Sequence, residues 1–187
     1  IFKKGYLDVP LEHQITQQFL DDYPLNKKIF EEVNEEMEAK EAISDSEMRM
    51  DAMYAVREVA KEKMGIHKLK SVVSVLRGSV DEANRMGIEE LKATLYTEIE
   101  NNVGRFFDDK GNVNIFEDEE IMNKYMTLRA LREGIIRKSP NGKSMLWGKD
   151  KALIVTAPRS VDLVDFFADY LNTDDGQLVK EEINKRS

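Results

Sequence analysis

Apolar residues recur at helical spacing through most of this chain, and that periodicity constrains its fold more than any other feature. One clear example is a face of five residues that Gly104 would close: Ile88, Leu91, Leu95, Ile99 and Val103. The sequence pattern changes after residue 134. Pro-Asn-Gly at 140–142 separates two short segments of β character, and a β-rich run over 152–157 follows. The pattern predicts a mainly α chain of the α+β class. We expect a helical bundle-like core and a small β-hairpin or three-stranded element near residues 135–157.

The same pattern divides the chain into an N-terminal arm over 1–25, a helical region over 26–133 and a mixed region over 134–187. The mixed region could pack on the helical region as one domain. Two Ser-x-x-Glu capping boxes, Ser44 with Glu47 and Ser79 with Glu82, predict helix starts. Gly65 fits the position just after the end of a helix over 47–64.

Composition excludes several chemistries. The chain has no cysteine and only two histidines, far apart, so thiolate catalysis, disulfides, cysteine zinc sites and the H-E-x-x-H pattern are excluded. There is no run of 18 apolar residues and no signal-peptide core near the N-terminus. We therefore predict a non-enzymatic protein without a cofactor or membrane span, in the cytoplasm or elsewhere inside the cell, or in a virion. The first residue is Ile, so we expect a piece of a longer product or a chain whose first residues are missing here.

Two acidic patterns invite a metal interpretation. Residues 108–119 resemble a calcium loop, but Lys110 stands where a ligand is required and Val113 where the loop needs glycine. An Asp-Lys-Gly-Asn turn leading into a helix explains the stretch better, and we predict no metal site there. On the helix after Pro158, one face carries Asp162, Asp165 and Asp169, which could hold Mg²⁺ for phosphoryl chemistry. The simpler interpretation of this row is a solvated helix face.

Charge is unevenly distributed along a chain of net charge −8. Residues 134–159 carry six basic side chains against one acidic one, and a second basic island covers 66–87. These islands could neutralise acidic segments, or they could contact a phosphate backbone on which Trp147 stacks against a base. The predicted nucleic-acid-binding residues are Lys68, Lys70, Arg77, Arg137, Lys138, Lys143, Trp147, Lys149 and Lys151.

The first 42 residues favour a different role, protein–protein contact. An acidic helix over 26–42 carries a narrow apolar stripe, and the arm before it has apolar side chains that need cover. The predicted partner-binding residues are Phe2, Tyr6, Leu7, Ile29, Phe30, Val33 and Met37. The leading prediction is an assembly or adaptor protein that binds a protein partner or itself, within a virus particle or a nucleic-acid-processing assembly. The alternative is a DNA- or RNA-binding factor.

Overall fold

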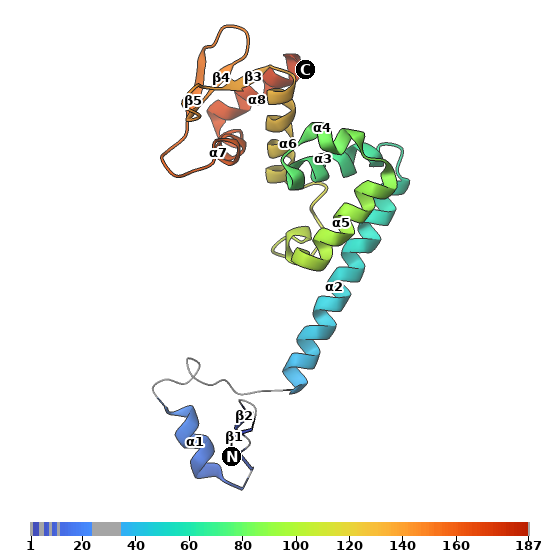
Figure 1. The fold of residues 1–187 in the computed structure, drawn as a ribbon, viewed down its shortest axis with the longest axis vertical. Helices are drawn as coiled ribbons and strands as arrows, with labels where there is room; N and C mark the ends of the chain where they lie inside the picture. Colours follow the sequence, from blue (N-terminus) through green and yellow to red (C-terminus); the bar gives the residue numbers. More distant parts are fainter. Residues whose placement is uncertain (1, 4–5, 8, 11, 24–34, 187) are drawn as a thin grey trace. The chain divides into compact units, whose positions relative to one another are not determined.

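The fold was analysed in a computed structural model, which describes residues 2–3, 6–7, 9–10, 12–23 and 35–186. The described residues are mostly helical, with one three-stranded antiparallel sheet, which confirms the predicted α+β class (Figure 1). Contacts divide the chain into residues 1–44 and residues 45–187. The division falls inside helix α2 (Glu35–Lys61), so the two units are described separately.

The first unit holds little regular structure. Strands β1 (Phe2–Lys3) and β2 (Tyr6–Leu7) pair antiparallel, and helix α1 (Gln14–Asp21) follows them. None of the residues of α1 is buried. The predicted apolar stripe at Ile29, Phe30 and Val33 lies outside the described residues.

The second unit begins with a cluster of helices. They are α3 (Gly65–Arg77), α4 (Val80–Arg85), α5 (Ile88–Asn102) and the 3-10 turn η1 (Val103–Phe106), which pack with the C-terminal part of α2. Their apolar faces form a first core cluster: Ala52, Val56, Val59, Leu69, Val72, Val73, Ala83, Leu91, Leu95, Ile99, Phe106 and Ile115. The spacing that predicts one face of α5 is confirmed, since Leu91, Leu95 and Ile99 are fully buried.

A second core cluster lies further along the chain. Its elements are α6 (Glu119–Arg132), β3 (Ile136–Lys138), β4 (Ser144–Trp147), β5 (Leu153–Thr156), α7 (Leu163–Tyr170) and α8 (Asp174–Arg186). The buried residues are Ala130, Ile136, Met145, Ala157, Leu163, Phe167, Leu171 and Ile183. Helix α6 packs against both α3 and α7 and so joins the two clusters. The predicted domain limits at 25 and 133 remain predictions.

The three strands follow one another in the order β3-β4-β5, and their register sets two faces. Ile136 pairs with Trp147, and Met145 pairs with Val155, on the face that meets the second core cluster. The other face carries Arg137 opposite Leu146. The turn between β3 and β4 contains Gly142 at φ 69°, as the Pro-Asn-Gly signal predicts.

The helix-start predictions have mixed outcomes. Ser79 caps α4, because its hydroxyl accepts from the Glu82 N–H at 3.2 Å, so that capping box is confirmed. The box at Ser44 is wrong, since α2 continues unbroken through Ser44. Gly65 is not a helix end but the first residue of α3. Within the described residues, no helix combines the length and apolar composition needed to cross a membrane.

Candidate interaction surfaces

The basic island over 134–159 is not neutralised by the rest of the described chain. None of its six basic side chains has a carboxylate within ion-pair distance among the described residues. By contrast, the cations of α3 are engaged locally. Lys68 pairs with Glu62 at 2.8 Å, which raises the pKa of Lys68, and Arg77 lies 3.9 Å from Glu82. Lys70 donates to the Asn84 carbonyl at 3.2 Å.

The sheet divides the predicted basic residues between its two ends. Lys143 and Lys149 lie in the turns before and after β4, so the length of that strand separates them. The Ala157 N–H donates to the Lys143 carbonyl at 2.8 Å, so the end of β5 lies beside Lys143. The sheet therefore forms two exposed basic groups: Lys138, Lys143 and Arg159 at one end, and Lys149 and Lys151 at the other.

Trp147 is a core residue at least in part. Its ring is half-buried against the second core cluster, and the Arg186 guanidinium lies 4.3 Å from the ring centroid. Arg137 is half-buried on the opposite face of the sheet, where its Nε has no hydrogen-bond partner. The structure therefore does not gather Trp147 and Arg137 on one face with the exposed lysines.

The carboxylates of the predicted metal patterns have structural partners. Asp108 accepts from the N–H groups of Asn112 at 2.8 Å and Lys110 at 2.9 Å, so the predicted turn is confirmed. Asp162 caps α7 by accepting from the Val164 N–H at 2.8 Å. Asp165 lies 3.2 Å from Lys124 of α6. Within the described residues, no cluster of three or more His, Asp or Glu could hold a metal ion.

Lys124 lies between two carboxylates. Burial alone would lower the pKa of Lys124, but its hydrogen bonds to Glu120, at 2.6 Å, and to Asp165 raise it above the usual 10.5. The Lys124–Asp165 contact stabilises the packing of α6 on α7, which explains one member of the aspartate row without a metal.

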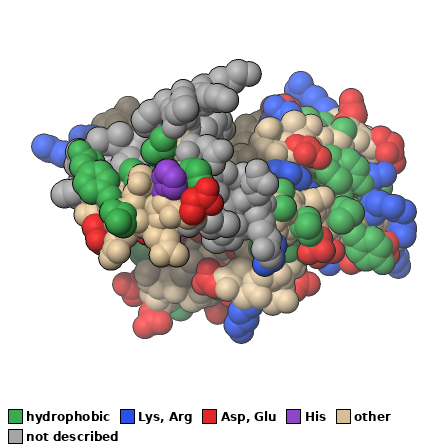
Figure 2. Space-filling view, turned by 90° about the horizontal axis from the view of Figure 1, so that it is seen from below, with side chains coloured by type: hydrophobic (Ala, Val, Ile, Leu, Met, Phe, Trp, Pro, Cys, Tyr) green, Lys and Arg blue, Asp and Glu red, His purple; other side chains and the backbone are tan. Residues whose placement is uncertain are grey.

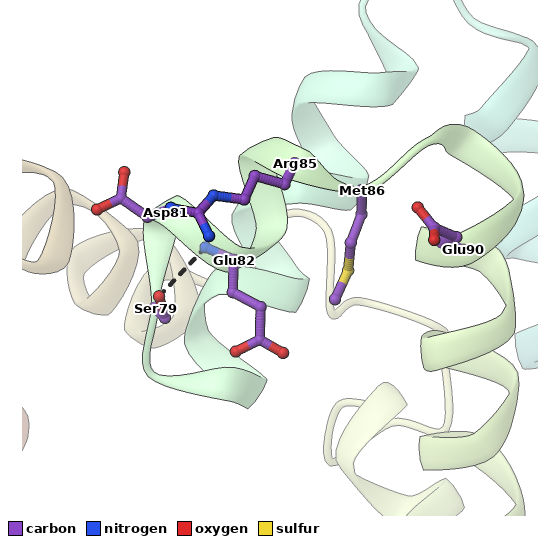
Figure 3. A pocket seen from close by; sticks show the side chains of 6 residues that line it. All are labelled: Ser79, Asp81, Glu82, Arg85, Met86 and Glu90. Carbon is purple, nitrogen blue, oxygen red and sulfur yellow. Dashed lines mark hydrogen bonds between the residues drawn. The ribbon is translucent and has the colours of Figure 1, made fainter.

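A shallow hollow lies along α4 and the start of α5 (Figure 3). Its volume is about 510 Å³, and it is lined by Ser79, Asp81, Glu82, Arg85, Met86 and Glu90. Most of its polar groups are already bonded. Asp81 pairs with Arg132 at 2.6 Å, and Glu90 accepts from the Gly87 N–H at 2.8 Å. The hollow presents no convergent set of free polar groups for a ligand.

Exposed apolar side chains occur on several elements, and Figure 2 shows hydrophobic side chains at the surface in more than one place. Two helices carry them in pairs at helical spacing. On α1, Ile15 is 88% exposed and Phe19 is 63% exposed, four residues apart on one face. On α2, Met50 and Tyr54 are exposed to 61% and 60%, again four residues apart. Leu7, one of the predicted partner-binding residues, is also exposed. The side chains of the predicted residues Phe2, Tyr6 and Met37 lie outside the described ones.

The exposed pair on α2 was not predicted from the sequence, whereas the apolar side chains of the N-terminal arm were expected to need cover. Met50 and Tyr54 lie on the helix face opposite Ala52, Val56 and Val59, which the first core cluster buries. The apolar spacing predicts that Ala52, Val56 and Val59 share one face of the helix, as the structure shows. It does not show that an apolar pair on the opposite face stays exposed. A comparison with protein families, with curated proteins and with solved structures finds no match for this chain.

Proposed function

We propose that this chain is a non-enzymatic assembly or adaptor protein that acts through protein–protein contacts. The observation that carries the proposal is the pair of uncovered apolar patches, Ile15 with Phe19 on α1 and Met50 with Tyr54 on α2. Exposed apolar area costs about 25 cal/mol per Å² relative to burial. A partner that covered either patch would recover that free energy.

Helix α1 gives the argument further support. It has eight residues, and helices shorter than about 12–15 residues are marginal in water on their own. Its apolar face is not buried within the described chain, so packing on another surface would supply the stabilisation that it lacks. The predicted partner residues over 29–37 would extend the same kind of contact.

The proposal can be tested by site-specific photo-crosslinking. A photoreactive phenylalanine analogue is placed at Phe19 or at Tyr54 of the full-length protein in its own cells, and Asp169, exposed on α7, is the control position. We expect discrete protein adducts from Phe19 and Tyr54 but not from Asp169. If irradiation at both patch positions yields no protein adduct, the proposal is wrong.

The second candidate function is binding of DNA or RNA, supported by the unpaired cations of residues 134–159. Phosphate contacts by Lys143 and Lys149 would release counterions and make binding strongly salt-dependent. Lys143→Glu combined with Lys149→Glu should weaken binding to a labelled duplex and reduce the slope of log K against log salt by about 2.

Lys110→Glu, in the loop after η1, is the matched control for this charge reversal, since Lys110 is also exposed. It should change neither affinity nor salt slope. Binding that does not fall with rising salt, or that survives the double reversal, would exclude this second function.

A further inference from the structure

The exposed face of α2 carries opposite charges at the two ends of an apolar pair. Glu47, Met50, Tyr54 and Arg57 are spaced by three, four and three residues, so they form one row along the helix. All four are exposed, on the side opposite the first core cluster. The row therefore runs from an acidic residue through two apolar residues to a basic one.

The charged ends of this row have no ion-pair partner within the described chain. The neighbouring ion pairs use other residues: Arg49 with Asp45, Lys61 with Glu58 and Lys68 with Glu62. Glu47 and Arg57 are left unpaired among the described residues. Two exposed and opposite charges thus flank an exposed apolar pair.

A second copy of the same face fits this order when the helices run antiparallel. Met50 and Tyr54 each lie two residues from position 52, and Glu47 and Arg57 each lie five residues from it. A two-fold axis at that position would place Met50 against Tyr54 of the second copy. It would also place Glu47 against Arg57 of the second copy, twice by symmetry.

We propose that this face, the Glu47–Arg57 row of α2, binds a second copy of the chain in an antiparallel, two-fold symmetric pair. The inference rests on the proposed function and names its partner. Charge complementarity favours a second copy in the antiparallel orientation. A parallel pair would place Glu47 against Glu47 and Arg57 against Arg57, and these like charges repel. The apolar centre consists of only four side chains, so the dimer is weak and concentration-dependent.

The test is sedimentation velocity of the full chain at rising concentration, with three charge variants. Glu47→Arg and Arg57→Glu each turn both ionic contacts into repulsions, and each should weaken dimerisation at least about tenfold. The double variant Glu47→Arg/Arg57→Glu exchanges the charges and should return the wild-type dimerisation constant. Each reversal also creates a pair of opposite charges four residues apart on α2, so the helix is not weakened. The partner is Asp51 in Glu47→Arg and Lys61 in Arg57→Glu.

Met50→Ser tests the apolar centre and should abolish dimerisation. Met64→Ser is its matched control, because Met64 is 58% exposed but lies beyond the end of α2. Circular dichroism checks that each variant is folded.

Two results would overturn the inference. One is a chain that stays monomeric at every concentration, and the other is a double variant that dimerises no better than the single ones. Crosslinks from Tyr54 to a different protein would then leave the proposed function standing. If neither Phe19 nor Tyr54 gives a protein adduct, both the proposed function and the proposed dimer are wrong.

Discussion

Gly65 shows how a single residue sets the path between α2 and α3. A Cβ at this position would overlap the carbonyl oxygen of Val59, in the last turns of α2. The first turn of α3 can approach α2 this closely only because residue 65 has no side chain. The requirement is therefore space and not an unusual backbone angle.

Gly65→Ala should lower the free energy of unfolding by about 1–3 kcal/mol, because the two helices must separate to admit the methyl group. Urea denaturation followed by circular dichroism measures the change. Gly104→Ala is the control, since a Cβ there would meet no described atom within 4 Å. Equal stability of the two variants would contradict the close-approach argument.

Asp108 gives a second prediction at the residue scale, on pH. The Asn112 N–H is the main cause that lowers the pKa of Asp108 below its usual 3.8, with help from Lys110. A lowered pKa in the folded state means that the ionised group stabilises the fold above pH 3.8 and loses this effect as the pH falls through the folded value.

Asp108→Ala should therefore be less stable than the wild type at neutral pH, and the difference should narrow as the pH falls below 3.8. Urea midpoints measured from neutral pH down to acid give the comparison. Asp109→Ala, which changes the exposed neighbour, should show no such convergence. A difference that stays constant with pH would exclude the ionised carboxylate as the cause.

At the scale of elements, α7 depends on its N-cap. The Asp162 carboxylate accepts from the Val164 and Asp165 N–H groups, so Asp162→Ala should cost about 1 kcal/mol of stability. Asp169→Ala, at an exposed position of the same helix, should be nearly neutral. Thermal melting of the two variants measures this difference. If the two aspartates were equivalent surface carboxylates, both substitutions would change the melting temperature equally.

The elements also show where sequence prediction works and where it stops. The turn at Pro140-Asn141-Gly142 and the cap at Ser79 were predictable because each depends on its own few residues. Ser44 carries the same Ser-x-x-Glu signal, yet α2 runs through it. The residues before Ser44 are strong helix formers, so the helix extends across a possible start instead of beginning there.

The interaction surfaces were less predictable, because exposure is a property of the whole molecule. Periodicity places Val56 with Ala52 and Val59 on one apolar face of α2, and the first core cluster buries that face. The sequence does not show that Tyr54, on the other side of the helix, stays exposed, because that depends on what packs around it. Likewise, a basic segment is visible in the sequence, but the separation of Lys143 from Lys149 depends on the register of the sheet.

For the molecule as a whole, α6 couples two core clusters that share no buried residue. Ile121, near its start, packs on the first cluster, and Ala130, near its end, is buried in the second. Loss of either cluster would leave part of α6 without its packing surface. We therefore expect residues 45–187 to unfold in one transition.

Leu95→Ala tests this coupling, because Leu95 is fully buried in the first cluster while Trp147, the single tryptophan, packs on the second. The substitution should cost about 2–5 kcal/mol. If the clusters unfold together, the urea midpoint reported by Trp147 fluorescence must fall by the same amount as the midpoint of far-UV circular dichroism. Leu171→Ala, in the second cluster, should shift both signals equally as well. A Trp147 midpoint that does not move in Leu95→Ala would mean that the second cluster holds without the first, and α6 would then be a connector between independent cores.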